Sequence, residues 1–163
     1  MAGLITVDQQ ALEFVEGAIS LEADGKQLKK EFGTNLKAAV EPILPVIRSE
    51  LMTMGGNIPV EPPLRTTVAN AMSSRVRYSG NSPGVRVQIS RKGMPRGFDD
   101  AARKINQGAW LHPLWGREGT AIMQLGVSDF FDGPLRAGQP EMREAVVAAL
   151  EAMAQRIADR AGG

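Results

Sequence analysis

The sequence of 163 residues contains no cysteine and only one histidine, His112. Without cysteine, the chain forms no disulfide, offers no thiol nucleophile and cannot ligate zinc or iron–sulfur clusters through thiolates. A single imidazole also excludes a metal site that needs several histidines of one chain. We therefore expect no metal and no cofactor, and we assign no catalytic residues.

Long apolar runs are missing as well. The longest stretch without a charged residue is Ile105–Gly116, whose 12 residues include a proline. A transmembrane helix needs about 20 apolar residues, so the sequence predicts no membrane span. Residues 1–20 also lack the cationic start and apolar run of a secretory signal.

Acidic side chains are scarce in the middle of the chain, although the net charge of the whole is only +1. Residues 65–117 hold ten basic and two acidic side chains, a net charge of +8, and the remainder carries −7. This division has three interpretations: a face for nucleic acid, neutralisation within the fold, or contact with an acidic part of a neighbouring copy.

The apolar fraction of 43% and the charged fraction of 23% are ordinary for a folded protein. With this length they predict a single domain over residues 1–163. Near the start, Leu4 and Ile5 predict a short edge strand.

A helical stripe is the clearest pattern in the sequence. Apolar residues recur at steps of three and four, which predicts an amphipathic helix over about 24–52. They are Leu28, Phe32, Leu36, Val40, Ile43, Ile47 and Leu51. Pro42 and Pro45 lack amide hydrogens, so we expect a kink near residues 38–41.

Two alternating runs predict an antiparallel hairpin over about 75–90. Val76 and Tyr78 alternate with polar neighbours, as do Val85 and Val87, and a glycine-rich stretch separates the two runs. Alternation over residues 121–125 predicts a third strand.

Residues 92–119 have no clear period and contain many glycines and prolines, so we expect an extended loop or arm there. After it, apolar residues at helical spacing from Met142 to Ile157 predict a C-terminal helix over about 140–160. The predicted fold class is α+β: the long kinked N-terminal helix and the C-terminal helix pack on a small antiparallel sheet.

The candidate chemistry is sparse. Asp99 and Asp100 are adjacent, but neighbours on an extended chain point to opposite sides, so they form no acid–base couple. They fit the start of a helix at Ala101 better, because acids favour the positive end of a helix. His112 lies between two tryptophans without a nucleophile motif, and a histidine packed in a turn explains it more simply.

The basic hairpin is a candidate for charged contacts with a subunit or with the DNA backbone. Arginines on a strand surface can follow phosphates, and they can equally pair with carboxylates of this chain or of a neighbour. The candidates are Arg75, Arg77, Arg86, Arg91 and Lys92.

Aromatic side chains are few, and most lie beside the expected arm. Buried indoles often dominate interfaces, so this group is a candidate subunit interface; the alternative is a satellite core on the chain's own hairpin. The candidates are Trp110, His112, Trp115, Phe130 and Phe131.

The order of these elements resembles the neck, or tail-completion, protein family of long-tailed bacteriophages and prophages. The similarity runs from about residue 5 to residue 160. Its motifs are Ala23-Asp-Gly-Lys-Gln-Leu-Lys-Lys-Glu31, Pro63-Leu-Arg65, Gly84-Val-Arg-Val87, Met94-Pro-Arg-Gly-Phe98 and Trp110-Leu-His-Pro-Leu-Trp-Gly116, followed by Gln124 and Phe130-Phe131.

This resemblance implies a non-enzymatic structural virion protein. The resemblance also implies a cyclic ring of six or twelve copies that joins the capsid portal complex to the tail and surrounds the DNA passage. It also implies contacts with other connector and tail-terminator proteins, assembly in the host cytoplasm and no membrane partner. Two alternatives stay open: a tail terminator that caps the tail tube, and a DNA-binding accessory protein that uses the basic hairpin.

Overall fold

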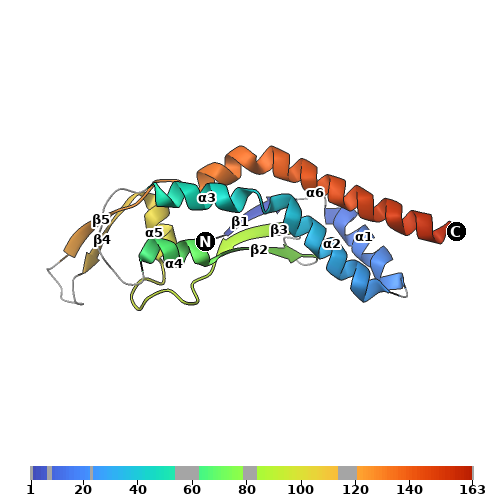
Figure 1. Cartoon of the computed structure of the whole chain (residues 1–163), viewed down its shortest axis with the longest axis horizontal. Coiled ribbons are helices and arrows are strands. Elements are labelled where there is room, and N and C mark those ends of the chain that lie inside the picture. Colours follow the sequence, from blue (N-terminus) through green and yellow to red (C-terminus); the bar gives the residue numbers. More distant parts are fainter. Residues whose placement is uncertain are drawn as a thin grey trace. The chain divides into compact units, whose positions relative to one another are not determined.

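The computed structural model describes residues 2–6, 9–22, 24–53, 63–78, 84–113 and 121–162. Its helices are α1 (Gln9–Leu21), α2 (Gly25–Val40), α3 (Ile43–Met52), α4 (Leu64–Asn70), α5 (Ala101–Gln107) and α6 (Asp132–Ala161) (Figure 1). Its strands are β1 (Ala2–Thr6), β2 (Met72–Arg77), β3 (Gly84–Ile89), β4 (Ala109–Pro113) and β5 (Ala121–Leu125). This mixture of helix and sheet confirms the α+β class.

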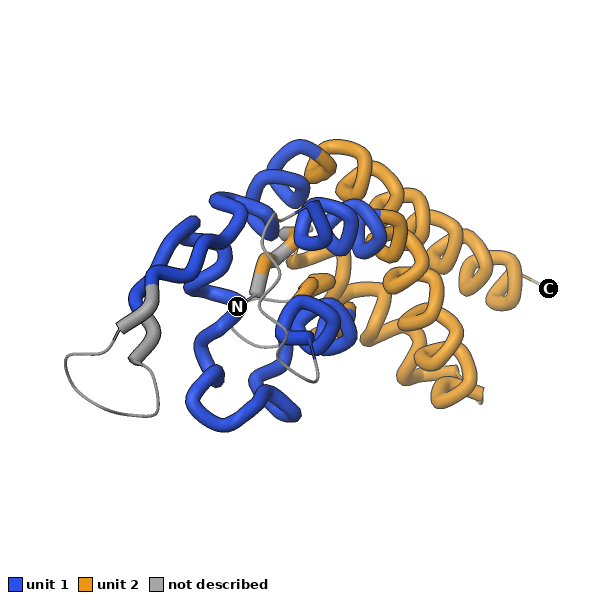
Figure 2. The backbone as a smooth tube through the Cα atoms, turned by 60° about the vertical axis from the view of Figure 1, so that its left-hand side comes forward, with its two compact units in different colours: residues 1, 43–73, 89–137 blue, residues 2–42, 74–88, 138–163 orange. Residues whose placement is uncertain are grey.

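The chain divides into two compact units (Figure 2). The first contains residues 43–73 and 89–137, and the second contains 2–42, 74–88 and 138–163. Each unit gathers segments that are far apart in sequence. The expectation of a single domain over 1–163 stays a prediction.

Most of the three-stranded sheet, in the order β1-β3-β2, belongs to the second unit. β1 pairs antiparallel with β3, so that Ile5 lies opposite Val85. Six residues, 78–83, join β2 to β3. A parallel crossover needs a dozen or more, so β2 and β3 are antiparallel. The predicted hairpin and the N-terminal edge strand are confirmed.

The helix predicted over 24–52 is wrong as a single element, because α2 ends at Val40 and α3 begins at Ile43. Pro42 has no amide hydrogen to continue the ladder of α2. Pro45 lies in the first turn of α3, where an amide needs no partner within the helix. The predicted stripe is nevertheless correct in its burial: all of its residues are 8% exposed or less.

A close contact joins α2 to the sheet. The hydroxyl of Tyr78, just after β2, donates a hydrogen bond to the carbonyl oxygen of Lys29 at 3.1 Å. The rings of Phe32 and Tyr78 lie 6.1 Å apart between centroids. A side chain at Gly33 would overlap the Tyr78 hydroxyl, so only glycine leaves room for this bond.

The C-terminal helix begins eight residues earlier than the predicted residue 140, at Asp132. Asn106 explains the earlier start, since its Oδ1 accepts a hydrogen bond from the Phe131 amide at 2.9 Å and its Nδ2 donates to Asp132 at 2.7 Å. These bonds satisfy groups at the helix terminus. Pro140 therefore lies inside α6, where it removes one hydrogen bond.

The extended arm predicted over 92–119 is wrong over residues 101–113, because 101–107 form α5 and 109–113 form β4. Residues 92–100 contain turns and no helix or strand, as expected. The two elements are short, so their periodicity is weak in sequence. Gly108, with a φ of 97°, turns the chain between them, a conformation that favours glycine. The helix start predicted at Ala101 is confirmed, as is the strand predicted over 121–125.

None of the helices in the described part of the chain combines the length and apolar character needed to cross a membrane.

Candidate interaction surfaces

Phe130 and Phe131, two of the candidate interface aromatics, are buried at 1% and 0% exposure. Their rings meet edge to face with centroids 6.4 Å apart. They belong to the core of the first unit and present no surface to another molecule. For these two residues the alternative interpretation, a satellite core, is the one that the burial supports.

The remaining aromatic candidates lie on or near β4. Trp110 is half-buried and lies opposite Gln124 of β5. His112 is in β4, opposite Ile122, but its side chain lies outside the described residues. Trp115 lies outside them entirely.

An exposed apolar surface on the ribbon of β4 and β5 was missed by sequence reasoning. Leu111 lies opposite Met123, and Ala109 lies opposite Leu125. Directly opposed residues of an antiparallel pair share one face, so these side chains form a single row. Leu111 is 61% exposed, Met123 60% and Leu125 68%. We call Ala109, Leu111, Met123 and Leu125 the apolar ladder.

The ribbon is anchored at one end by glycines. Gly126 donates its amide to the carbonyl oxygen of Gly108. A Cβ at Gly126 would overlap the Ile105 backbone of α5, so the approach requires glycine. The ladder could have been anticipated from sequence only by pairing 109–113 with 121–125, which requires the register and not the pattern of either strand alone.

The three hairpin arginines lie on one face of the three-stranded sheet. Arg75 and Arg77 are exposed and alternate with half-buried Val76, while Arg86 of the central strand alternates with the fully buried Val85 and Val87. All three therefore point away from α2. We call Arg75, Arg77 and Arg86 the arginine face.

No carboxylate of the described residues forms an ion pair with the arginine face. The Nε atom of Arg86 is buried and has no hydrogen-bond partner there. A buried donor without a partner costs free energy of about 1–3 kcal/mol.

The other two basic candidates differ from this face. Arg91 forms an ion pair with Asp100 at 3.1 Å, and Arg103 binds the second oxygen of the same carboxylate at 3.3 Å. Lys92 is exposed, and its backbone amide donates to the Ser90 hydroxyl. The predicted set therefore separates into three parts: the arginine face, which has no ion-pair partner among the described residues, Arg91, which shares Asp100 with Arg103, and the exposed Lys92.

The phenol of Tyr78 is a titratable group beside the three-stranded sheet. Burial raises the pKa of Tyr78 above its ordinary value, and the negative charge of Glu16 adds to the effect. The phenol therefore stays protonated at neutral pH and keeps donating to Lys29. Within the described ranges, no three or more histidine, aspartate or glutamate side chains gather closely enough to hold a metal ion.

Comparison with known proteins gives no match to a family model, a curated protein or a solved structure.

Proposed function

We propose that this chain is a structural virion protein: one subunit of a ring in the phage head–tail connector, which joins the capsid portal complex to the tail and surrounds the DNA passage. The sequence resemblance supports the biological setting. The observation that carries the proposal in the structure is the apolar ladder. A subunit of an assembly needs surfaces that its own chain leaves uncovered.

The ladder suits a protein contact for two physical reasons. A two-stranded ribbon is marginally stable in water, and a neighbour that covers one face would stabilise it. Contiguous apolar side chains on a surface typically mark a site of protein association. Full burial of Leu111, Met123 and Leu125 contributes about 1.5–3 kcal/mol for each side chain.

In this proposal the subunit interface contains fewer of the candidate aromatic residues than the sequence suggested. The ladder makes the subunit contact, whereas Trp110 lies on the other face of the ribbon. Phe130 and Phe131 only support the unit that carries the ladder. The adjoining molecules are further copies in a ring of six or twelve, together with the other connector and tail-terminator proteins. The protein acts without a cofactor in the neck of the virion.

Light scattering during size-exclusion chromatography, with negative-stain imaging, tests ring formation. We expect the parent chain to form closed rings and Leu111→Gln/Met123→Gln/Leu125→Gln to remain a folded monomer. Val46→Gln/Met52→Gln is the matched control, because both side chains are 47% exposed on α3 and lie outside the ladder. Assembly that survives the ladder substitutions would exclude the ladder as the contact.

A stop codon early in the gene, in a phage or prophage that carries it, tests the setting. We expect lysates with DNA-filled heads and separate tails of normal length. Tails of uncontrolled length would indicate the alternative, a tail terminator, because an uncapped tube continues to polymerise. Normal joined particles with altered DNA handling would indicate the DNA-binding accessory protein and contradict the proposal.

A further inference from the structure

The second unit carries a set of exposed carboxylates that has no partner in its own chain. Glu141, Glu144 and Glu151 are exposed on α6, and none forms an ion pair or hydrogen bond with another described residue. At 3.6 residues per turn they fall within about 80° around the helix axis and span about 15 Å along it. We call them the acidic stripe.

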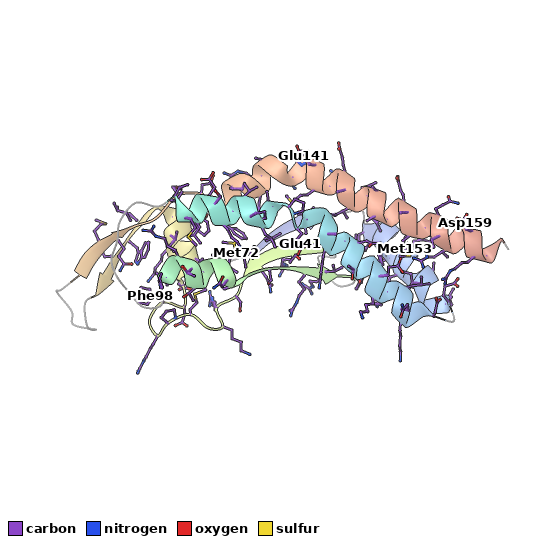
Figure 3. All side chains as sticks on the ribbon, in the orientation of Figure 1. Glu41, Met72, Phe98, Glu141, Met153 and Asp159 are labelled. Carbon is purple, nitrogen blue, oxygen red and sulfur yellow. The ribbon has the colours of Figure 1, made fainter. Side chains whose placement is uncertain are left out.

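The acidic stripe points away from the core of the second unit. Met142, Val146, Leu150 and Met153 form the buried side of the same helix. Figure 3 shows Glu141 and Met153 on opposite sides of α6. Ion pairs of Arg156 with Glu31 and of Arg160 with Asp24 hold this helix beside α2.

The arginine face lies on the other side of the same unit. α2 contacts the sheet through Tyr78 and α6 through two ion pairs, and the arginines lie on the sheet face opposite to Tyr78. The two charged surfaces therefore cannot meet within one copy. Each has three charges of one sign, and they can meet when two copies associate.

We propose that the arginine face of one copy binds the acidic stripe of a second copy of this chain. The contact joins two different surfaces on opposite sides of a subunit, so it is heterologous and repeats from copy to copy. Such a repeat generates a ring or a filament and not a two-fold dimer. This inference rests on the proposed ring and names the second surface that a ring requires besides the ladder.

Dimensions and chemistry agree with this pairing. Arg75 and Arg77 are about 7 Å apart along β2, and Arg86 is on a strand about 4.8 Å away. Glu144 and Glu151 are about 10.5 Å apart along α6, which extended guanidinium groups can bridge. Arginine can bind a carboxylate through two parallel hydrogen bonds, which orients the partner.

Double-stranded DNA is the competing occupant of the arginine face, and the charge of the chain favours a second copy. The net charge of +1 gives little long-range attraction to a polyanion. Three other carboxylates of the second unit have partners in their own chain: Glu16 with Lys29, Glu31 with Arg156 and Asp24 with Arg160. The acidic stripe and the arginine face each carry three charges, and the two sets are of opposite sign.

Two charge-reversed chains test the pairing. Variant A is Arg75→Glu/Arg77→Glu, which leaves the half-buried Arg86 in place, and variant B is Glu144→Arg/Glu151→Arg. At 50 mM NaCl we expect each variant alone to assemble at least tenfold more weakly than the parent. An equimolar mixture should restore assembly with alternating A and B, because each altered surface then meets its complement.

Lys30→Glu/Lys37→Glu is the control for charge reversal, since both lysines are exposed on α2 and have no described partner. Circular dichroism and thermal melts establish that every variant folds. Failure of the A and B mixture to assemble overturns the proposal. Unchanged assembly of variant A, with loss of its affinity for random-sequence DNA, also overturns it and assigns the face to DNA.

Disulfide trapping extends the test to weak association, because the parent has no cysteine. Gln88→Cys is on the outward side of β3 and Ala148→Cys is within the acidic stripe. A chain with both cysteines should give a series of covalent oligomers on a non-reducing gel, and each single-cysteine variant should give nothing larger than dimers. Absence of these covalent oligomers in a folded double variant at 1 mM chain contradicts the pairing.

The outcomes also separate this inference from the proposed function. Rings that persist in variant A would overturn this inference alone, whereas a normal phage with the stop codon would overturn the proposed function alone.

Discussion

At the scale of single residues, Gly33 shows how a small side chain determines a contact between distant segments. Its missing Cβ leaves room for the Tyr78 hydroxyl to reach Lys29. Gly17 of α1 is different, since a Cβ there would meet nothing within 4 Å. The same substitution at the two glycines should therefore have opposite effects.

We expect Gly33→Ala to lower the free energy of unfolding by about 1–2 kcal/mol, because the displaced hydroxyl loses its acceptor. Gly17→Ala should raise it by about 0.5–1 kcal/mol, since alanine costs less backbone entropy in a helix. Urea denaturation measures both.

The same glycine substitution in a Tyr78→Phe chain tests whether the hydroxyl causes the loss of stability at Gly33. In Tyr78→Phe the hydroxyl is absent, so Gly33→Ala should become neutral or stabilising there. A loss of stability that is equally large in both backgrounds would contradict the explanation.

At the scale of elements, the ion pair of Asp24 with Arg160 joins the start of α2 to the end of α6. The hydrogen bond from Arg160 holds the pKa of Asp24 below its ordinary value of 3.8. The same bond raises the pKa of Arg160. A carboxyl whose folded pKa is depressed stabilises the fold above its unfolded pKa, and this stability is lost as the pH falls through the folded value.

We therefore expect Asp24→Asn to lower Tm slightly at pH 7, because both groups are exposed and screened by solvent. The difference from the parent should shrink as the pH falls below 3.8. Thermal melts between pH 7 and pH 2 measure it. Asp99→Asn is the control for the loss of one carboxylate, as Asp99 is exposed without a described partner. A difference for Asp24→Asn that grows with acid would contradict the sign.

At the scale of the whole molecule, the near-neutral chain is divided into surfaces of opposite charge. Complementary surfaces mainly accelerate and orient association, and salt screens them within a Debye length of about 10 Å at 0.1 M. Apolar burial in the ladder is far less sensitive to moderate salt.

We therefore expect the rate of assembly to fall about tenfold between 50 and 500 mM NaCl in the parent chain. In a chain that carries both the variant A and variant B substitutions, the two surfaces again have opposite charges, with each sign exchanged. The assembly rate of this chain should therefore depend on salt as in the parent. Stopped-flow light scattering measures both rates. A rate that does not change with salt would exclude the charged contact from the encounter between copies.

Much of the fold was predictable from local patterns. The α+β class, the edge strand, the hairpin at 72–89 and the burial of the stripe from Leu28 to Leu51 all follow from periodicity. The break at Pro42 was predicted in position but not in degree, since a proline can bend a helix or end it. The start of α6 depends on Asn106, 26 residues away from Asp132.

The candidate surfaces were predictable only in part. Alternation placed Arg75, Arg77 and Arg86 opposite the apolar side of their strands, and the sheet confirms this side. The aromatic group was defined by proximity in sequence, which does not separate the buried Phe130 from the half-buried Trp110. The apolar ladder depends on the pairing of two strands, and neither strand reveals it alone.

The sequence by itself determined what this protein lacks and how its charge is divided. No fold can supply a thiol or a second imidazole to a chain without them, and a net +8 over residues 65–117 is independent of structure. Tertiary structure decided which of those charges keep partners, because pairing requires side chains from distant segments to meet. It brought Arg91 to Asp100, and it left the arginine face and the acidic stripe on opposite sides of one unit.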